Sequence, residues 1–116
     1  MKVLIDKEPD GPVIFMVNLR DECVKKPGVL YLVALQTMFA MQKGELLAKK
    51  PEMDFLMRLA KTDQIFLAKK ICSGTDHIVY IIESDDKTVE KISEEDINEA
   101  ELSALVSAKK KLKTFM

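Results

Sequence analysis

Apolar side chains crowd the stretch Val29–Met41, where Leu, Val, Met and Phe residues occupy positions on nearly every helical face. A helix that is apolar all round is typical of an element enclosed by the rest of its domain. The stretch therefore predicts a helix buried on most sides, with Gly44 as its C-terminal stop. Pro51 suits the first turn of the next helix, and Glu52 and Asp54 lie near the positive end of that helix.

A second short helix is expected in the stretch Lys61–Cys72, which reads KTDQIFLAKKIC and opens with a capping pair, Thr62 and Asp63. At about 100° per residue, its apolar side chains spread across one wide side. Gln64 falls on that same side, where its amide needs a hydrogen-bond partner if it is buried. The apolar side consists of Ile65, Leu67, Ala68, Ile71 and Cys72.

Strand patterns occur near the N-terminus and after the middle helices. The runs KVLID and VIFMV are separated by Pro-Asp-Gly turn chemistry, so Lys2–Val17 is expected to form a hairpin. The continuous β-branched run HIVYIIE, which begins at His77, is typical of a central strand. With the helices, these patterns predict an α+β fold. We expect a single domain, residues 1–116, with a small mixed or antiparallel sheet of about three to five strands covered by several helices.

Three further helices are expected from their caps. Asn18 is a candidate cap for a short helix through Val24, and Ser84–Ser93 has the cap and spacing of another. Asn98 has Glu101 three residues on, which resembles a capping box that opens a helix to about Lys113. The apolar stripe of that last helix is Leu102, Leu105, Val106 and Leu112.

Charge is unevenly distributed, although the 116 residues carry a formal net charge of only −1. Residues 43–70 hold seven basic and four acidic side chains, whereas residues 83–101 hold nine acidic side chains and two lysines. Separate blocks of this kind can bind an anion on one side and repel it on another, although an ordinary solvated surface also explains them. The hydrophobic fraction of 47% suits a globular protein, and no apolar run reaches the length of a membrane span.

The residues that usually carry catalysis are sparse. His77 is the sole histidine and is expected to be structural, and no Cys, His and carboxylate spacing resembles a metal site. No glycine-rich phosphate loop or nucleophile elbow occurs, so we expect a protein that is not an enzyme and has no cofactor. Cys23 and Cys72 lie far apart within apolar patterns, and the start MKVLID lacks the apolar core and the cleavage site expected of a signal peptide. They are expected to be reduced, buried thiols of a cytoplasmic protein, with a disulfide as the alternative.

Phe66, Lys69 and Lys70 suggest a different kind of site on the helix of the stretch Lys61–Cys72. Both lysines fall opposite its apolar side, and Phe66 projects between them. An aromatic ring flanked by ammonium groups can stack a base while the lysines contact phosphates. Alternatively, Phe66 packs beneath a neighbouring loop and the lysines are merely solvated.

The middle of the chain resembles the Cgi family of accessory subunits of the KEOPS complex, the PRPK-binding protein-like family. The resembling stretch reads LVALQTMFAMQKGELLAKKPEMDFLMRLAKTDQIFLAKKIC, and a weaker likeness extends over residues 13–112. Asp63 stands where the family carries an arginine, and Ala60-Lys61 replaces its Ser-Gly. If that arginine contacts RNA in relatives, the contact here has moved to Lys61 or is weaker. The residues that match the family pattern are Ala34, Gly44, Glu45, Lys49, Leu56, Leu59, Thr62, Gln64, Ile65 and Ala68.

The resemblance implies a non-catalytic subunit that supports threonylcarbamoyladenosine modification of tRNA. Such subunits bind the small atypical kinase/ATPase of the complex and the 3′ acceptor end of the tRNA. On this basis we expect an RNA-binding patch of Lys49, Lys50, Arg58, Lys61, Phe66, Lys69 and Lys70. For docking onto the kinase we expect the last helix, through Leu105, Val106, Leu112 and Phe115.

Two rival functions are compatible with the same residues. The first is a purely protein-binding adaptor that activates a small kinase without touching RNA. The second is an unrelated ligand-binding domain or enzyme, which would need a buried polar cleft around His77 and Gln64. Titration with tRNA, intact or without its single-stranded tail, separates the first rival from the RNA-binding subunit.

Overall fold

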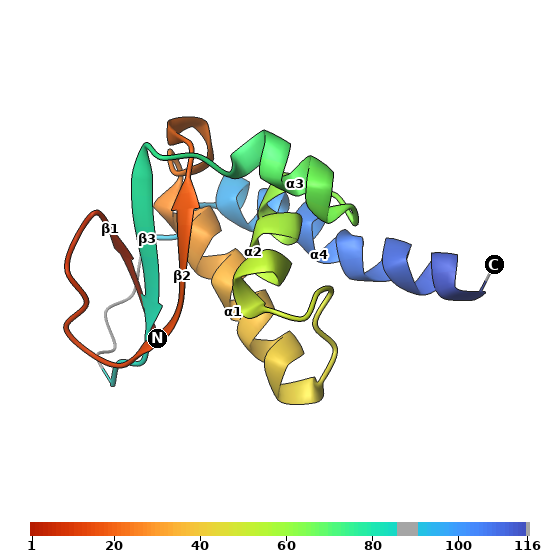
Figure 1. The fold of residues 1–116 in the computed structure, drawn as a ribbon, viewed down its shortest axis with the longest axis horizontal. Helices are drawn as coiled ribbons and strands as arrows, with labels where there is room; N and C mark the ends of the chain where they lie inside the picture. Colours follow the sequence, from red (N-terminus) through yellow and green to blue (C-terminus); the bar gives the residue numbers. More distant parts are fainter. Residues whose placement is uncertain (86–90, 116) are drawn as a thin grey trace.

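In the part of the chain that the structure describes, a three-stranded antiparallel sheet and four α-helices form the α+β fold that the sequence predicts (Figure 1). The structure is a computed structural model that describes residues 1–85 and 91–115, with side chains through residue 110. The elements follow the order β1 (Lys2–Ile5), β2 (Val13–Leu19), η1 (Asp21–Cys23), α1 (Pro27–Lys43), α2 (Pro51–Ala60), α3 (Ile65–Cys72), β3 (His77–Ile82) and α4 (Glu94–Phe115).

The sheet has the order β1-β3-β2, with β3 antiparallel to both neighbours. The predicted N-terminal hairpin is therefore wrong, because β1 and β2 run in the same direction on opposite sides of β3. The Pro-Asp-Gly segment belongs to a loop that returns along the sheet and meets the far end of β3, where Glu83 N donates to Pro12 O at 2.9 Å. A Cβ at Gly11 would lie 2.9 Å from the Glu83 carbonyl oxygen, so this close passage requires glycine.

The prediction of β3 as a central strand is confirmed. This strand pairs with β1 on one edge and with β2 on the other, and its residues Val79, Ile81 and Ile82 are buried. The helical layer covers one face of the sheet, where α1 packs on β1 and α2 packs on β2. The rings of Phe15 on β2 and Phe55 on α2 meet with centroids 5.5 Å apart.

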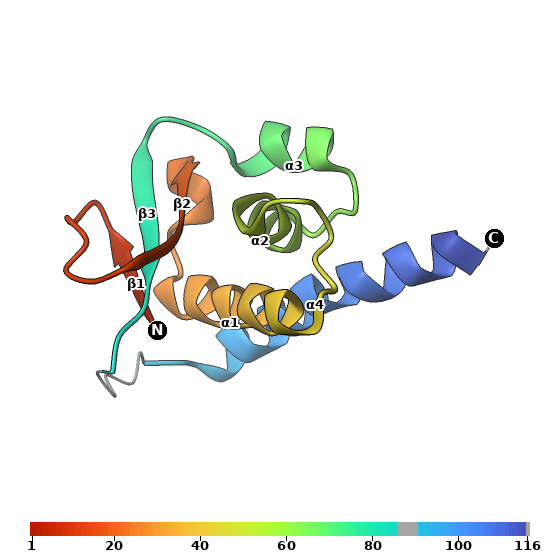
Figure 2. The ribbon, with the colours of Figure 1, turned by 60° about the horizontal axis from the view of Figure 1, so that its bottom comes forward.

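The predicted helix Val29–Met41 is confirmed as the longer helix α1, which starts at Pro27. It ends at Gly44, which is left-handed at φ 67°, as the C-terminal stop requires. Pro51 begins α2, also as predicted. Figure 2 shows the helices as a stack, in which α3 lies on α2, α2 lies on α1, and α4 runs beside α1. The C-terminal half of α4 projects beyond this stack (Figure 2).

Three predicted caps are wrong. The N-cap residue of α3 is Gln64 and not the predicted pair Thr62 and Asp63. Asn18 lies within β2, and the turn that follows is the short 3-10 helix η1, which comes after Arg20. Helix α4 begins at Glu94 instead of near Asn98, because Ser93 and Asp96 form a capping box. Asp96 N donates to Ser93 Oγ and Ser93 N donates to Asp96 Oδ2, both at 3.1 Å.

The helix predicted over Ser84–Ser93 falls largely on residues 86–90, outside the described residues, and the described positions at its ends are not helical. Over residues 1–85 and 91–115, no helix combines the length and the apolar character needed to cross a membrane.

Candidate functional site

Helix α3 presents apolar side chains to solvent. Ala68 and Cys72 are its buried residues, whereas Ile65, Leu67 and Ile71 are exposed. The main neighbour of α3 is α2, so one narrow row of side chains is covered and the rest of the predicted apolar side is not. Gln64, expected on the buried side, is exposed because it is the N-cap residue and precedes the first helical turn.

Phe66 stands out on this surface, with 80% of its area exposed. Lys69 and Lys70 follow at positions i+3 and i+4, so the ring and both ammonium groups share one face of α3. Both lysines are exposed, and no hydrogen bond or ion pair within the described residues engages them. We call Phe66, Lys69 and Lys70 the α3 face. It places an exposed aromatic ring and two exposed lysines on one side of the helix, as the spacing predicts.

The remaining cations of the predicted patch have different surroundings. Lys49 and Lys50 are exposed in the loop that enters α2. Lys61 is the left-handed C-cap of α2, and its Nζ lies 3.3 Å from Glu99 Oε1 on α4. This ion pair links the end of α2 to α4. Because Glu99 already neutralises the Lys61 ammonium group, Lys61 is less suited to take over an RNA contact of the family arginine. A carboxylate 38 residues away in the sequence is a partner that spacing alone does not reveal.

Arg58 does not belong to a phosphate-contacting surface, because it is only 4% exposed. Its Nε donates to Asp54 Oδ1 at 2.8 Å and its Nη2 donates to Asp54 Oδ2 at 3.2 Å. Thr37 Oγ1 and Leu47 N also donate to this carboxylate, at 2.6 and 2.9 Å. Asp54, expected near the open start of α2, is instead fully buried and joins α1, the loop before α2 and α2 itself. The i, i+4 spacing of Asp54 and Arg58 on α2 is the sequence feature that could have indicated this ion pair.

Cys23 and Cys72 form a disulfide, which corrects the expectation of reduced thiols. Their Cα atoms lie 5.7 Å apart, within the range that a disulfide spans. The backbone brings them together, because Arg20 N donates to Cys72 O at 2.8 Å beside η1. The bond fastens the C-terminal end of α3 to η1. Nothing in a sequence separation of 49 residues indicates this proximity.

The partner face predicted on α4 is divided between solvent and core. Leu105 is 53% exposed and Leu102 is similarly open, so both are accessible to a partner. Val106 is 1% exposed and belongs to the core, which removes it from the predicted docking residues. The side chains of Leu112 and Phe115 lie outside the described side chains.

His77 joins three segments at one end of the sheet. Its Nδ1 lies 2.5 Å from Asp6 Oδ2, and its Nε2 lies 2.8 Å from Asp21 Oδ1. The hydrogen bonds that protonated His77 donates to Asp6 and then to Asp21 raise the pKa of His77 above its ordinary value, and the bond from His77 lowers the pKa of Asp6. Asp76 Oδ2, the other carboxylate nearby, accepts from Asp21 N at 3.0 Å. In the described part of the chain, no group of His, Cys, Asp and Glu is arranged to hold a metal ion.

Replacing His77 by Gln is expected to flatten the dependence of stability on pH. A raised folded-state pKa means that protonated His77 stabilises the fold below pH 6.5 and that this contribution disappears as pH rises through the folded pKa. Ionised Asp6, whose folded-state pKa is lowered, stabilises the fold above pH 3.8. This stabilisation is lost as the pH falls through the folded-state pKa. Urea unfolding midpoints should therefore decline from about pH 6 to pH 8 in the parent and stay level in His77→Gln. Parallel curves for the two proteins would contradict this prediction.

Comparisons with known protein-family models and with curated proteins find no match to this chain. What is established is therefore the α+β fold and, on it, the exposed α3 face, the buried Asp54–Arg58 pair and the Cys23–Cys72 disulfide.

Proposed function

We propose that this protein is a non-catalytic subunit of a KEOPS-type complex and supports threonylcarbamoyladenosine modification of tRNA. In this role the α3 face holds the single-stranded 3′ acceptor end, and α4 docks onto the small atypical kinase/ATPase. The observation that carries the proposal is the 80% exposure of Phe66 beside Lys69 and Lys70. The resemblance of residues 32–72 to Cgi subunits supports the choice of complex.

The α3 face suits a single strand for physical reasons. Base stacking on an aromatic ring contributes about 1–3 kcal/mol per base, and it tolerates any sequence because every base has a π-face. Ammonium groups that are not paired within the protein release counterions when they meet phosphates. Lys49 and Lys50 remain candidates for further phosphate contacts. Arg58 and Lys61 are left out, because carboxylates of this chain already hold them.

Lys69→Glu combined with Lys70→Glu is expected to weaken tRNA binding and to flatten its salt dependence. Each phosphate contact to a single strand contributes about 0.7 to the slope of log affinity against log salt, so two lost contacts should reduce the slope by about 1.4. Fluorescence anisotropy with labelled tRNA over a range of salt concentrations measures both effects. Phe66→Ala should instead weaken the binding free energy for tRNA by about 1–3 kcal/mol. It should leave the slope of log affinity against log salt unchanged.

The matched control changes the same charge elsewhere. Lys7 and Lys109 are exposed, and neither lies on α3. The double variant Lys7→Glu with Lys109→Glu should therefore leave the contact between the α3 face and tRNA intact. A tRNA without its single-stranded tail should bind the parent as weakly as intact tRNA binds the α3 variants. Equal affinities for all variants at low salt would remove the α3 face from the proposal.

The exposed leucines of α4 favour a second candidate, a purely protein-binding adaptor that activates a small kinase. Leu102 and Leu105 are three residues apart, so they present one apolar strip on the helix. The exposed Ile65, Leu67 and Ile71 on α3 add apolar surface that suits a protein partner equally well. In this case the α3 variants would lose kinase binding while tRNA shows no affinity for the isolated protein.

Leu105→Glu is expected to abolish co-purification with the kinase subunit under either candidate. Because Leu105 is 53% exposed, the new charge stays in solvent. The free energy of unfolding of the variant should therefore lie within about 0.5 kcal/mol of the parent value. Pull-down with the kinase, together with urea unfolding, measures both quantities. Lys109→Glu on the same helix is the control, and retained co-purification of Leu105→Glu would move the docking site off α4.

A cytoplasmic location belongs to the proposal, and the disulfide makes it directly testable. Disulfides are typical of oxidising compartments, and the cytosol keeps most thiols reduced apart from those of hyperthermophiles. Alkylation of free thiols during cell lysis, followed by mass spectrometry, reports the state of Cys23 and Cys72 in the cell.

A further inference from the structure

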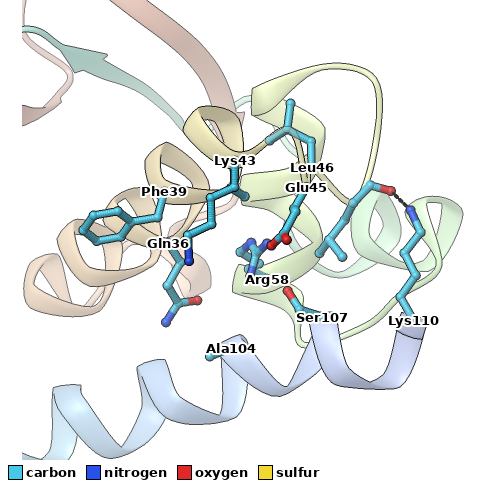
Figure 3. Close-up of a pocket in the computed structure, with 11 residues that line it drawn as sticks. Gln36, Phe39, Lys43, Glu45, Leu46, Arg58, Ala104, Ser107 and Lys110 are labelled. Atoms are coloured by element: carbon cyan, nitrogen blue, oxygen red, sulfur yellow. Dashed lines mark hydrogen bonds between the residues drawn. The ribbon is translucent and has the colours of Figure 1, made fainter. Parts of the chain in front are cut away.

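Helix α4 turns one side towards the rest of the domain and the opposite side towards solvent. On the inward side, Ala100, Ser103 and Val106 are buried. Figure 3 shows Lys110 directed from α4 towards the loop before α2, where its Nζ donates to the Leu47 carbonyl oxygen. These contacts fix which side of α4 faces outward.

Glu101, Leu105 and Lys109 form a single row on the outward side, which we call the α4 row. They are four residues apart, so they follow one another along one face of the helix. All three are exposed, and Leu102 beside the row is exposed as well. The α4 row therefore carries an acid at one end, an apolar side chain in the middle and a base at the other end.

The two charges of the α4 row have no partner on their own helix. Glu101 and Lys109 are eight residues apart, which is about 12 Å along the helix axis and too far for an ion pair. No residue of opposite charge stands three or four positions from either one, where a helix normally pairs its charges. Across the described residues, neither side chain makes an ion pair or a hydrogen bond.

The helix dipole does not account for these charges either. It favours acids near the N-terminus of a helix and bases near the C-terminus, but the effect falls off within the first and the last turn. Helix α4 runs over Glu94–Phe115, so Glu101 lies beyond its first turn and Lys109 lies before its last. Both charges would be satisfied by a partner that presents a base, an apolar side chain and an acid in the reverse order.

The α4 row of a second copy presents that reverse order when the two helices run antiparallel. With Leu105 of both copies on a twofold axis, Glu101 of each copy meets Lys109 of the other, and the contact closes as a dimer. Rows of residues four apart align when two helices cross at about 50°, the commonest packing angle. The C-terminal half of α4 projects beyond the helix stack, which leaves space for the second helix there (Figure 2).

We propose that the α4 row is a self-association surface, on which two copies of this chain pair antiparallel through Leu105 and two Glu101–Lys109 ion pairs. This inference goes beyond the proposed role in tRNA modification and does not depend on it. Leu105 also belongs to the surface proposed for the kinase, so a bound kinase would exclude the second copy. The contact is small, and we expect a reversible dimer with a dissociation constant on the order of 10–100 μM.

Sedimentation equilibrium of the full chain, over concentrations that span this dissociation constant, measures the dimer. Glu101→Lys and Lys109→Glu should each weaken it at least about tenfold, because each replaces two attractions by two repulsions. Combining both changes in one chain reverses the order of charges and should return the dissociation constant to within about threefold of the parent value. Glu8 is exposed in a loop away from α4, so Glu8→Lys is the control that alters net charge equally and should leave the dimer unchanged.

A disulfide crosslink tests the antiparallel register. Leu105→Cys brings two thiols together on the twofold axis, so oxidation by air should yield a covalent dimer. Leu102 is 54% exposed and Leu105 is 53% exposed, which makes Leu102→Cys a matched control. Its two thiols would lie about 9 Å apart along the helix axes, beyond the reach of a disulfide. The native cysteines are bonded to each other, so the introduced thiol is the free one.

The dimer and the kinase contact can fail separately. Lys109→Glu should lose the dimer and keep co-purification with the kinase subunit, since the kinase contact is assigned to the leucines. A parent protein that stays monomeric at every concentration would overturn the proposal and leave the α4 row to another partner. Failure of the combined charge reversal to recover pairing, or equal crosslinking of Leu102→Cys and Leu105→Cys, would overturn it as well.

Discussion

Removal of the Cys23–Cys72 disulfide is expected to lower the free energy of unfolding by about 4 kcal/mol. The bond closes a loop with a sequence separation of 49 residues, and the lost loop entropy of the unfolded chain accounts for this magnitude. Such a loss is a large part of the total stability of a domain of this size. Cys72 is buried, so Cys23→Ala with Cys72→Ala is the appropriate replacement, because serine would add a buried hydroxyl.

Urea unfolding with and without a thiol reductant provides the measurement. The reductant should lower the midpoint of the parent to that of the double alanine variant and leave the variant itself unchanged. Hydrogen exchange should quicken most at α3, because the disulfide fastens the end of that helix to η1 and α2 is its main packing neighbour. The cysteines would be shown to be reduced if the parent had the same unfolding midpoint with and without reductant and if two free thiols could be titrated in it.

Asp54→Ala is expected to destabilise the protein by about 3–5 kcal/mol, the usual effect of removing one partner of a buried ion pair. Asp54 is fully buried, and its loss leaves the Arg58 guanidinium, the Thr37 hydroxyl and the Leu47 N–H without their acceptor. The desolvation of these donors then has nothing to offset it. Urea unfolding of the parent and the variant measures the difference directly.

A double replacement separates the ion pair from simple packing. Asp54→Leu with Arg58→Met removes both charges, and it should destabilise less than Asp54→Ala because no buried charge remains. Glu52→Ala, in the same first turn of α2 but not fully buried, should change stability by no more than about 0.5 kcal/mol. A double variant as unstable as Asp54→Ala would show that shape, not charge compensation, dominates this site.

Features that depend on near neighbours in the sequence were predictable. The apolar run of α1, its stop at Gly44 and the start of α2 at Pro51 are settled by residues within a few positions of one another. The central position of β3 followed from its β-branched run, which is typical of a strand in the middle of a sheet. The i, i+3, i+4 spacing of Phe66, Lys69 and Lys70 likewise placed them on one face.

Features that depend on distant neighbours were missed. A Pro-Asp-Gly turn between two strand patterns indicates a hairpin, but β3, from much later in the chain, separates β1 from β2. Helical periodicity marked Ile65, Leu67 and Ile71 as apolar but could not tell that α2 covers only one row of α3. The pairing of Lys61 with Glu99 depends in the same way on a helix that follows later in the chain.

The sequence by itself determined the class of the fold, the main helices and which side chains of α3 share a face, because turns, caps and periodicity are local. Tertiary structure alone decided which of those side chains meet water. It buried Arg58 against Asp54, joined Cys23 to Cys72 and left Phe66 in solvent, because burial and pairing are set by elements that converge from distant parts of the chain.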